Sequence, residues 1–351
     1  MSSKTTSYSE LFSQIRKLIL SARKAVSRNV DTIQVLTCFE IGRRIVEHEQ
    51  QGLKRAEYGK QILKDLSKRL TDEFGKGFSE DNLTNMRKFY LAYREQKQIS
   101  ETPSRKLATL KDTPETHAQL TLSWSHYVFL IGVKDENARR FYEIETAQQD
   151  WSLRELKRQF DSGLYERLAL SRDKAAIMKL AQEGQTVSNP KDLLKEPYVL
   201  EFLGLDEKSK YSETDLESAI IDKLEHFLLE LGKGFLFEAR QKRFTFDEDH
   251  FFVDLVFYNR LLHCYVLIDL KIGKLTHQNI GQMQMYVNYF DRFVKSEDEN
   301  PTVGIILCKK KHDALVEITL PVNANIFASE YQLYLPTKEE LKQKLMDWAE
   351  E

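Results

Sequence analysis

The segment from Phe251 to Lys271 constrains the fold more than any other part of this 351-residue chain. Two runs rich in β-branched and aromatic residues, FFVDLVFY and CYVLIDLK, flank a short polar connection at Asn259-Arg260. Such runs are typical of β-strands, and their spacing predicts a hairpin. Each run contains a carboxylate, and a charge inside a strand is costly unless it is paired or binds a cation.

The charged residues of the two runs are expected to meet at one place. Successive side chains of a strand point to opposite faces, so Asp269 and Lys271 project from the same face. Asp254 lies on the neighbouring strand and can project from that face too. Two carboxylates and one ammonium group would then converge. A surface hairpin with a simple Asp269–Lys271 ion pair is the alternative interpretation.

Composition excludes several classes of protein. The chain has no apolar run long enough to cross a membrane as a helix, and its polar first residues lack the apolar core of a signal peptide. Cys38, Cys264 and Cys308 are far apart and are expected to be reduced, buried thiols. These features predict a cytoplasmic protein with no membrane partner.

Charge divides the chain into two unlike parts. Residues 1–190 contain 32 Lys and Arg against 25 Asp and Glu, whereas residues 191–351 contain 20 against 29. A basic first part favours contact with nucleic acid, and an acidic second part indicates a different task. Two solvated surfaces of unequal charge are the alternative.

Apolar residues at helical spacing predict an all-helical first half. The expected helices cover two stretches within 8–51, then about 58–73, 82–93, a stretch from about 119, 136–148, a stretch from Ser152 and about 165–180. Gly42 falls on an apolar helix face, where it would let another helix approach closely. The polar stretch 96–114 predicts a loop, and the break at 184–190 predicts a domain boundary. The expected domains are therefore 1–185 and 191–351.

One pair of the predicted helices has the outline of a helix-turn-helix. The turn FGKGF precedes Ser79, a predicted N-cap, and the helix that follows carries Arg87 and Lys88, with Arg94 after it. These cations are able to reach phosphates. Because many helical hairpins share this outline, DNA binding by these residues is a hypothesis, and Phe89 is expected to be a core residue.

From residue 191 onwards, helix and strand patterns alternate. The expected helices cover 191–204, 213–231, 279–293 and 338–350, and the expected strands cover 235–239, 242–247, 251–258, 263–271, 303–308 and 326–334. This order predicts a mixed α/β domain.

The order of the polar residues in this domain resembles the PD-(D/E)XK nuclease pattern. The residues concerned are Glu217 on a helix, Asp254 and Asp269-Leu270-Lys271 on strands, and Gln282 on the next helix. The surrounding words LLELGKGFLFEARQ, VDLVFY, IDLKIG and IGQMQMYVNYFD resemble YhcG-type nucleases, and so do YGKQILKDLSKRL, GFSEDNLTNMRKFY and WSLRELKRQF in the first half. The resemblance covers about residues 10–345. It implies a restriction-endonuclease-like αβββαβ mixed-sheet domain preceded by an all-α domain.

The resemblance also implies a metal site. Asp254 and Asp269 would be direct carboxylate ligands of Mg²⁺ or Mn²⁺, both of which prefer oxygen. The backbone carbonyl of Leu270 would add a further ligand, and Glu217 would hold a second ion, directly or through water.

Other residues of the pattern would act on water and phosphate. Lys271 would hold or help to deprotonate the attacking water, or offset charge on the phosphate. Gln282 would orient Lys271 or the phosphate. Arg240 and Gln241 match a family word and are expected beside the site, in contact with nucleic acid.

The chain departs from the family pattern at two places. Asp269 stands where a Glu is usual, which shortens the reach of the carboxylate by one methylene. His277-Gln278 stands where many relatives carry Pro-Glu, so an additional carboxylate is missing there. His277 is either a substrate contact or an ordinary loop residue.

The predicted function is that of a metal-dependent nuclease that hydrolyses phosphodiester bonds of DNA, an endonuclease in DNA processing, repair or restriction-type defence. DNA, a second copy of the chain, and restriction–modification or repair proteins are the expected partners. The alternative is a catalytically silent DNA-binding or assembly factor that keeps the nuclease fold.

Overall fold

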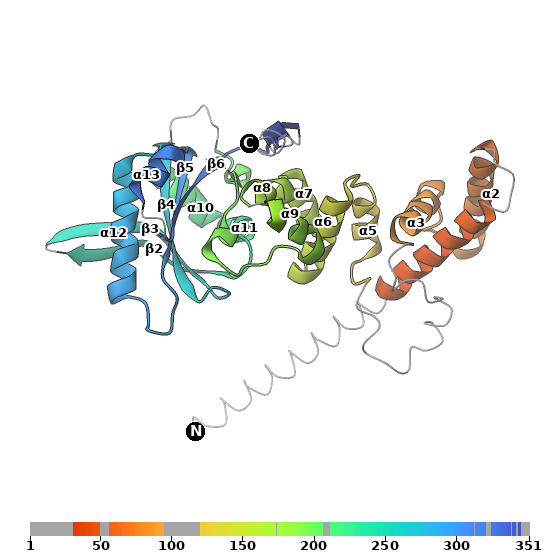
Figure 1. Cartoon of the computed structure of the whole chain (residues 1–351). Helices are drawn as coiled ribbons and strands as arrows, with labels where there is room; N and C mark the ends of the chain where they lie inside the picture. Colours follow the sequence, from red (N-terminus) through yellow and green to blue (C-terminus); the bar gives the residue numbers. More distant parts are fainter. Residues whose placement is uncertain are drawn as a thin grey trace, which may run out of the picture. The chain divides into compact units, whose positions relative to one another are not determined.

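The structure, a computed structural model, describes residues 31–49, 56–94, 120–172, 174–205, 211–246, 248–311, 313–320, 324–337, 339–341 and 343–344. The predicted helix before residue 31, the predicted loop at 96–114 and most of the predicted terminal helix at 338–350 lie outside these residues. The chain divides into two compact units, Met1–Leu156 and Lys157–Glu351. Figure 1 colours both units along the sequence.

The first unit is helical, as predicted. Its described helices are one over residues 31–49, α2 (Ala56–Phe74), α3 (Glu80–Tyr93), α5 (Trp124–Leu130), α6 (Glu136–Gln149) and the first residues of α7 (Leu153–Asp161). The predicted N-cap of α3 is confirmed, because the Ser79 hydroxyl accepts a hydrogen bond from the Asn82 N–H. At the start of α7, the Glu155 carboxylate accepts from the Ser152 N–H at 2.6 Å.

The helix over 31–49 packs closely against α3. A Cβ atom on Gly42 would lie 2.1 Å from the carbonyl oxygen of Met86, so only glycine permits this approach. Phe89 is fully buried, as predicted, and its ring contacts the rings of Phe39 and Tyr127. The surface of α3 that packs against the neighbouring helices is therefore apolar.

The second unit is built on a six-stranded mixed sheet with the order β1-β6-β5-β4-β3-β2. The strands are β1 (Tyr198–Val199), β2 (Phe235–Phe246), β3 (Asp249–Asn259), β4 (Cys264–Lys274), β5 (Val303–Lys310) and β6 (Ile326–Gln332). Strands β1, β6, β5 and β4 run parallel, and β3 pairs antiparallel with both β4 and β2. The β3–β4 hairpin predicted from the two acid-containing runs is confirmed.

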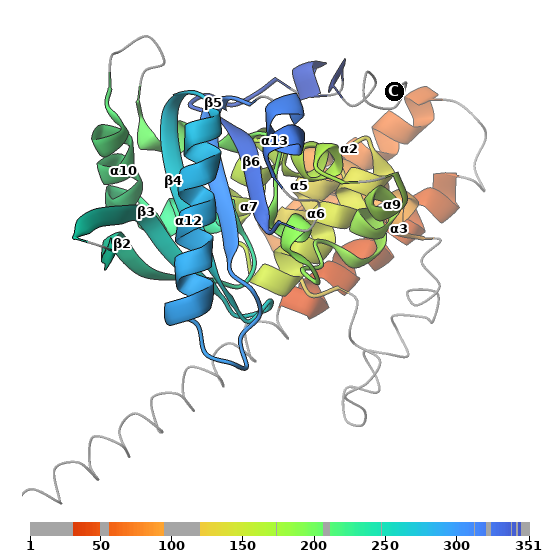
Figure 2. The same cartoon turned by 60° about the vertical axis from the view of Figure 1, so that its left-hand side comes forward.

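Helices cover both faces of this sheet (Figures 1 and 2). On one face, α10 (Glu213–Asp222) and α11 (Leu224–Leu231) pack on strand residues such as Leu255 and Ile268. On the other face, α12 (His277–Phe293) and α13 (Asp313–Thr319) pack on residues such as Val256 and Ile306. The element order contains the predicted αβββαβ core, and the predicted fold class is confirmed.

Four predicted elements differ from the structure. The helix expected over about 165–180 is two helices, α8 (Leu164–Leu170) and α9 (Lys174–Glu183). The helix expected over 213–231 is two helices, because Lys223 leaves the helical conformation with φ −119° and ψ 31°. The strands expected at 235–239 and 242–247 are the single strand β2, which pairs with β3 on both sides of the polar residues that suggested a break. The helix expected over 191–204 is two short 3₁₀ turns that flank β1.

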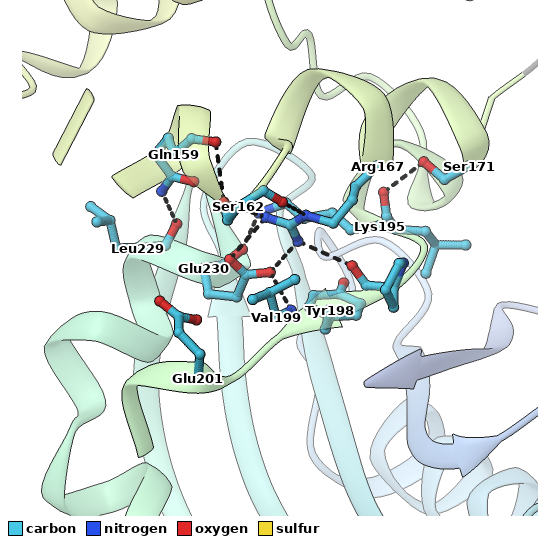
Figure 3. A network of polar contacts seen from close by, with 12 residues as sticks. Gln159, Ser162, Arg167, Ser171, Lys195, Tyr198, Val199, Glu201, Leu229 and Glu230 are labelled. Atoms are coloured by element: carbon cyan, nitrogen blue, oxygen red, sulfur yellow. Dashed lines mark hydrogen bonds and ion pairs between the residues drawn. The ribbon is translucent and has the colours of Figure 1, made fainter. Parts of the chain in front are cut away.

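A buried polar network belongs to the second unit (Figure 3). Arg167 lies on α8 (Leu164–Leu170), which α9 (Lys174–Glu183) follows. Its guanidinium group contacts the Glu230 carboxylate of α11, with 2.5 Å between Nη1 and Oε1, and both side chains are fully buried. Glu230 also accepts a hydrogen bond from the Val199 N–H at 3.0 Å. A buried charge pair needs such additional partners.

This network joins α8 to the sheet unit. The compact units therefore divide between Leu156 and Lys157, whereas the sequence changes character at 184–190. The domain limits 1–185 and 191–351 stay a prediction.

The structure also bears on the membrane and cysteine predictions. In the part of the chain that the structure describes, no helix is both long and apolar enough to cross a membrane. Cys38, Cys264 and Cys308 are buried free thiols, as expected.

Candidate active site

The predicted site lies where β3 and β4 stop pairing. The ladder between them ends at Leu255 and Ile268, although β3 begins at Asp249 and β4 continues to Lys274. Beyond this point β3 stays with β2, and β4 stays with β5. We call this opening the fork.

Asp254 occupies the fork. Its Oδ2 accepts a hydrogen bond from the Leu270 N–H at 2.9 Å. A side-chain carboxylate thus takes the place of a strand carbonyl as the acceptor for β4.

Strand geometry is irregular on both sides of the fork. Val253 packs under α12 while Leu255 packs under α10 and α11, although strict alternation would place both on one face. Opposite Asp254, Gln241 on β2 has a φ of 46°, in the left-handed region. These irregularities bring the two side chains together, and Gln241 Nε2 donates to Asp254 Oδ1 at 3.1 Å.

Asp269 and Lys271 form a buried pair on β4, as the spacing predicts. Lys271 Nζ lies 2.8 Å from Asp269 Oδ2, and their side chains are only 13% and 2% exposed. Burial raises the pKa of Asp269 to about 7; the Lys271 ammonium opposes this rise and the Asp254 carboxylate adds to it. Burial opposes the charged form of Lys271, but Asp269 outweighs it and raises the pKa of Lys271 above its usual range.

Glu217 projects from α10 and is linked to the fork through β2. Its carboxylate accepts hydrogen bonds from Arg240 Nε at 2.5 Å and from Gln241 Nε2 at 2.5 Å. Arg240 also donates to the Ser218 hydroxyl. The Gln241 amide therefore bridges Glu217 and Asp254, and Arg240 and Gln241 lie beside the site, where the resemblance placed them.

Gln282 lies on α12 and contacts a residue that sequence reasoning missed. Its amide donates to the hydroxyl of Tyr286, one helical turn later. Burial raises the pKa of this hydroxyl, the Gln282 hydrogen bond opposes the rise, and the negative charges of Asp269 and Asp254 add to it. Tyr286 is thus close enough to the acids to sense their charge. Its i, i+4 spacing from Gln282 was a signal in the sequence.

Glu213 was also missed. Its Oε2 lies 3.6 Å from Lys271 Nζ. It is the first residue of α10, and no sequence pattern indicated that the start of this helix lies near the end of β4. Lys271 therefore contacts two carboxylates, one on its own strand and one on α10.

The oxygen atoms of the fork fit a hard divalent cation. Asp269 Oδ2 is buried and contacts Lys271 without accepting a hydrogen bond of regular geometry, and Asp254 lies beside it. The Leu270 N–H points to Asp254, and the N–H and carbonyl of one strand residue point to the same side. The carbonyl of Leu270 is therefore directed into the fork.

Glu217 fits a metal less directly. Both of its carboxylate oxygens already accept hydrogen bonds. Among the residues that the structure describes, no three His, Cys, Asp or Glu side chains are grouped closely enough to hold an ion together. Metal binding by Asp254 and Asp269 therefore stays a prediction, as do the catalytic roles of all five residues.

The three residues of the first unit that are predicted to bind nucleic acid differ in their surroundings. Arg87 Nε lies 2.7 Å from Glu49 Oε2, so this cation is engaged within the unit. Lys88 is exposed on α3, and Arg94 is exposed at its C-terminal end. Contact of Arg87, Lys88 and Arg94 with phosphate stays a prediction.

Comparison with known proteins places both parts of the chain in described families. Residues 191–346 match the YhcG PDDEXK nuclease domain, and residues 14–167 match the DUF1016 N-terminal domain. Over 97% of its length the chain is 40% identical to the protein named "Putative nuclease YhcG" of Escherichia coli (strain K12), of which it covers 94%.

Two solved structures also show similarity. A repair endonuclease from Pyrococcus abyssi matches 37% of this chain with 16% identity and a TM-score of 0.25. EndoMS in complex with double-stranded DNA matches 38% of this chain with 14% identity and a TM-score of 0.25. The matched regions span 50% and 51% of those two proteins. The family resemblance seen in the sequence is confirmed by the 40% identity over 97% of the chain, and the chain belongs to the YhcG family of PDDEXK nucleases.

Proposed function

We propose that this protein is a Mg²⁺- or Mn²⁺-dependent endonuclease that hydrolyses phosphodiester bonds of DNA in DNA processing, repair or restriction-type defence. The observation that carries the proposal is the position of Asp254 beside the buried Asp269–Lys271 pair in the fork. Family membership supports nuclease chemistry. DNA as the substrate and Mg²⁺ or Mn²⁺ as the metal ion are parts of this proposal.

Asp254, Asp269 and the carbonyl of Leu270 would hold the metal ion. When bound, a divalent ion supplies a Lewis acid and lowers the pKa of a water molecule. Asp254 is pre-positioned by two hydrogen bonds, from the Leu270 N–H and the Gln241 amide. This positioning reduces the reorganisation needed at the moment of reaction.

Lys271 would act as a fixed positive charge. Its raised pKa keeps it protonated at neutral pH. A protonated ammonium group donates hydrogen bonds, so it can hold the attacking water or offset charge on the phosphate. Of the roles that the resemblance left open, proton abstraction by Lys271 is the least compatible with this environment.

Gln282 and Glu217 would position neighbours of the reacting groups. Gln282 holds the Tyr286 hydroxyl on the α12 side of the fork. Glu217 anchors Gln241, which in turn holds Asp254. In the first unit, Lys88 and Arg94 would supply contacts to DNA phosphates, which are largely independent of sequence.

The test is cleavage of labelled DNA substrates with Mg²⁺, Mn²⁺ or EDTA. Asp254→Asn removes a ligand charge and is expected to lower cleavage by about 100-fold or more, the scale of a lost electrostatic contribution in a catalytic site. Asp249→Asn, on the same strand but exposed at the hairpin turn, is the matched control and should cleave like wild type. Cleavage in EDTA, or equal cleavage by both variants, would overturn the proposal.

One observation favours a second candidate, a silent nucleic-acid-binding factor. No three-ligand cluster is present among the described residues, and Glu217 is held by Arg240 and Gln241. Calorimetric Mn²⁺ titration of wild type against Asp254→Asn/Asp269→Asn separates the candidates. A silent factor would bind DNA but show the same absence of Mn²⁺ binding in both proteins.

A further inference from the structure

Strands β2 and β3 continue past the fork as a two-stranded hairpin. Its free end projects from the sheet in both views (Figures 1 and 2). One face of it is covered by α12: the rings of Phe244 and Phe251 stack at 5.5 Å, and Phe244 stacks on Tyr289 at 4.1 Å. This inner face belongs to the hydrophobic core.

The opposite face has no such cover. Arg243 pairs with Phe252 in the ladder, and Thr245 pairs with His250, so the four side chains share one face. All four residues are exposed, and Phe252 retains 44% of its accessible surface. We call these four residues the outer face.

The outer face holds its cation in place. Arg243 Nη2 lies 2.8 Å from His250 Nε2, and Thr245 Oγ1 lies 3.0 Å from His250 Nδ1. Arg243 Nη2 also lies 3.2 Å from His250 Nδ1, and since a guanidinium group can only donate, the imidazole is the acceptor in this contact. These contacts hold the guanidinium group against His250, and Phe252 is the cross-strand partner of Arg243 on the same face.

Charge on the outer face is not compensated. Within the described part of the chain, Arg243 forms no ion pair with a carboxylate, whereas its neighbour Lys242, on the inner face, pairs with Glu238 at 3.6 Å. The acids Glu248 and Asp249 lie at the turn of the hairpin, beyond His250. An exposed cation without a counter-charge beside an exposed aromatic ring fits a phosphate and a nucleobase.

The outer face is continuous with the fork. Gln241 contacts Glu217 of α10, on the side of the sheet opposite α12, and Arg243 follows Gln241 by two residues on that same side. Two residues of strand span about 7 Å, close to the length of two stacked nucleotides. A nucleic-acid strand whose phosphate lies in the fork would therefore pass over the outer face with its next nucleotides.

We propose that the outer face binds an unpaired strand of the nucleic-acid substrate, with Arg243 on a backbone phosphate and Phe252 stacked on a base. This inference rests on the proposed nuclease function and adds the class of substrate: a nucleic acid with a single-stranded segment beside the cleaved bond. An exposed ring can stack only on a base whose face is free. Bases inside a duplex are already stacked on both faces, so intact duplex does not use Phe252.

Binding and cleavage are measured separately on the full-length protein. Binding uses a fluorescent duplex with a 3′ or 5′ single-stranded extension, and a blunt duplex of the same sequence, both in EDTA so that no cleavage occurs. Cleavage uses the same oligonucleotides with Mn²⁺. The variants are Phe252→Ala and Arg243→Ala on the outer face. Their matched controls are Phe246→Ala and Lys242→Ala, the same kinds of side chain on the inner face.

Phe252→Ala and Arg243→Ala are expected to weaken binding of the extended duplex by about tenfold, the scale of one lost stacking contact. The blunt duplex should bind equally to all variants, and the inner-face controls should stay within twofold of wild type. Equal effects of inner-face and outer-face variants, or an equal loss on blunt duplex, would overturn the inference.

The two proposals fail in different ways. Wild-type cleavage with unchanged binding in Phe252→Ala and Arg243→Ala overturns the role of the outer face and leaves the nuclease proposal standing. Binding that depends on the outer face, without cleavage under any metal, overturns the nuclease proposal and supports the binding surface. No binding of any oligonucleotide overturns both.

Discussion

Lys271 Nζ lies 2.8 Å from Asp269 Oδ2 at the end of β4, where both side chains are largely buried. The ammonium group offsets the carboxylate charge, yet burial still raises the pKa of Asp269 to about 7. The carboxyl group of Asp269 is therefore partly protonated and partly ionised near physiological pH. A bound cation would stabilise the ionised form.

The raised pKa of Asp269 predicts that metal affinity depends on pH. At pH 8 Asp269 is already ionised, but below its pKa of about 7 the ion must displace a proton. Mn²⁺ affinity should therefore fall by about tenfold for each pH unit below 7. Calorimetric titration at pH 6, 7 and 8 measures this change. Asp269→Asn should bind weakly at every pH, and a wild-type affinity that is constant from pH 6 to 8 would contradict the prediction.

Two substitutions of Gln241 should distinguish the effect of backbone strain on stability from the effect of the lost amide on cleavage. Its φ of 46° suits glycine, which adopts the left-handed region without strain. Gln241→Gly and Gln241→Ala both remove the amide that bridges Glu217 and Asp254, so both should lower cleavage. Alanine at this φ should in addition cost about 1 kcal/mol of unfolding free energy relative to glycine. Urea denaturation and cleavage assays check the two effects, and equal stability of the two variants would refute the backbone argument.

The buried Arg167–Glu230 pair should dominate the stability of the second unit. Arg167→Met leaves Glu230 without its main cation and should lower the unfolding free energy by about 3–5 kcal/mol. Arg167→Met/Glu230→Gln removes both charges and should recover part of the loss. Arg140→Met, which breaks an exposed pair with Glu136, is the control and should cost less than about 1 kcal/mol. Denaturant unfolding of the four proteins tests this order.

Two helical glycines should respond to alanine in opposite directions. Gly42→Ala would place a Cβ atom 2.1 Å from the Met86 carbonyl oxygen, so the helix over 31–49 and α3 must separate. The cost should be about 1–3 kcal/mol, as for other overpacked sites. Gly281 in α12 is exposed and has open space around its Cα, so Gly281→Ala should stabilise by about 0.5–1 kcal/mol. Thermal denaturation of the two variants measures the direction of each change in stability.

Glu143 on α6 should make the first unit less stable as pH rises. Burial raises its pKa from 4.5 to about 7, and the Tyr93 hydroxyl, which donates to it at 3.0 Å, opposes the rise. Because the folded state holds the proton more tightly, this stabilisation is complete below pH 4.5 and is lost as pH rises through 7. Wild type should lose at most about 3 kcal/mol of unfolding free energy by this route. Glu143→Gln should flatten the profile of unfolding free energy between pH 5 and 8, and an unchanged slope would contradict this account.

The elements of the sheet unit were largely predictable because strands and helices leave periodic patterns. The acid-containing hairpin, the N-cap at Ser79 and the close approach at Gly42 all follow from local rules that the structure confirms. The break at Lys223 and the continuity of β2 were not predictable in this way. Both depend on what the neighbouring strand or helix offers, which local periodicity does not contain.

The candidate site was predictable in its residue types but not in its connections. Alternation correctly placed Asp269 and Lys271 together, because both lie on one strand. The same rule says nothing of Gln241 and Asp254, where both strands are irregular and alternation fails. Glu213 and Tyr286 come from two helices on opposite faces of the sheet, so their approach to the fork is a property of the packed fold.

The sequence by itself determined the family, the order of the elements and the identity of the charged residues, because local patterns and motifs indicate each of these. Only the tertiary structure decided how those residues connect. The end of β3–β4 pairing opens the fork, the Gln241 amide bridges two carboxylates, and burial moves the pKa of Asp269 to about 7. Hydrogen bonding and desolvation depend on which groups lie nearby in space, and residues distant along the chain supply them.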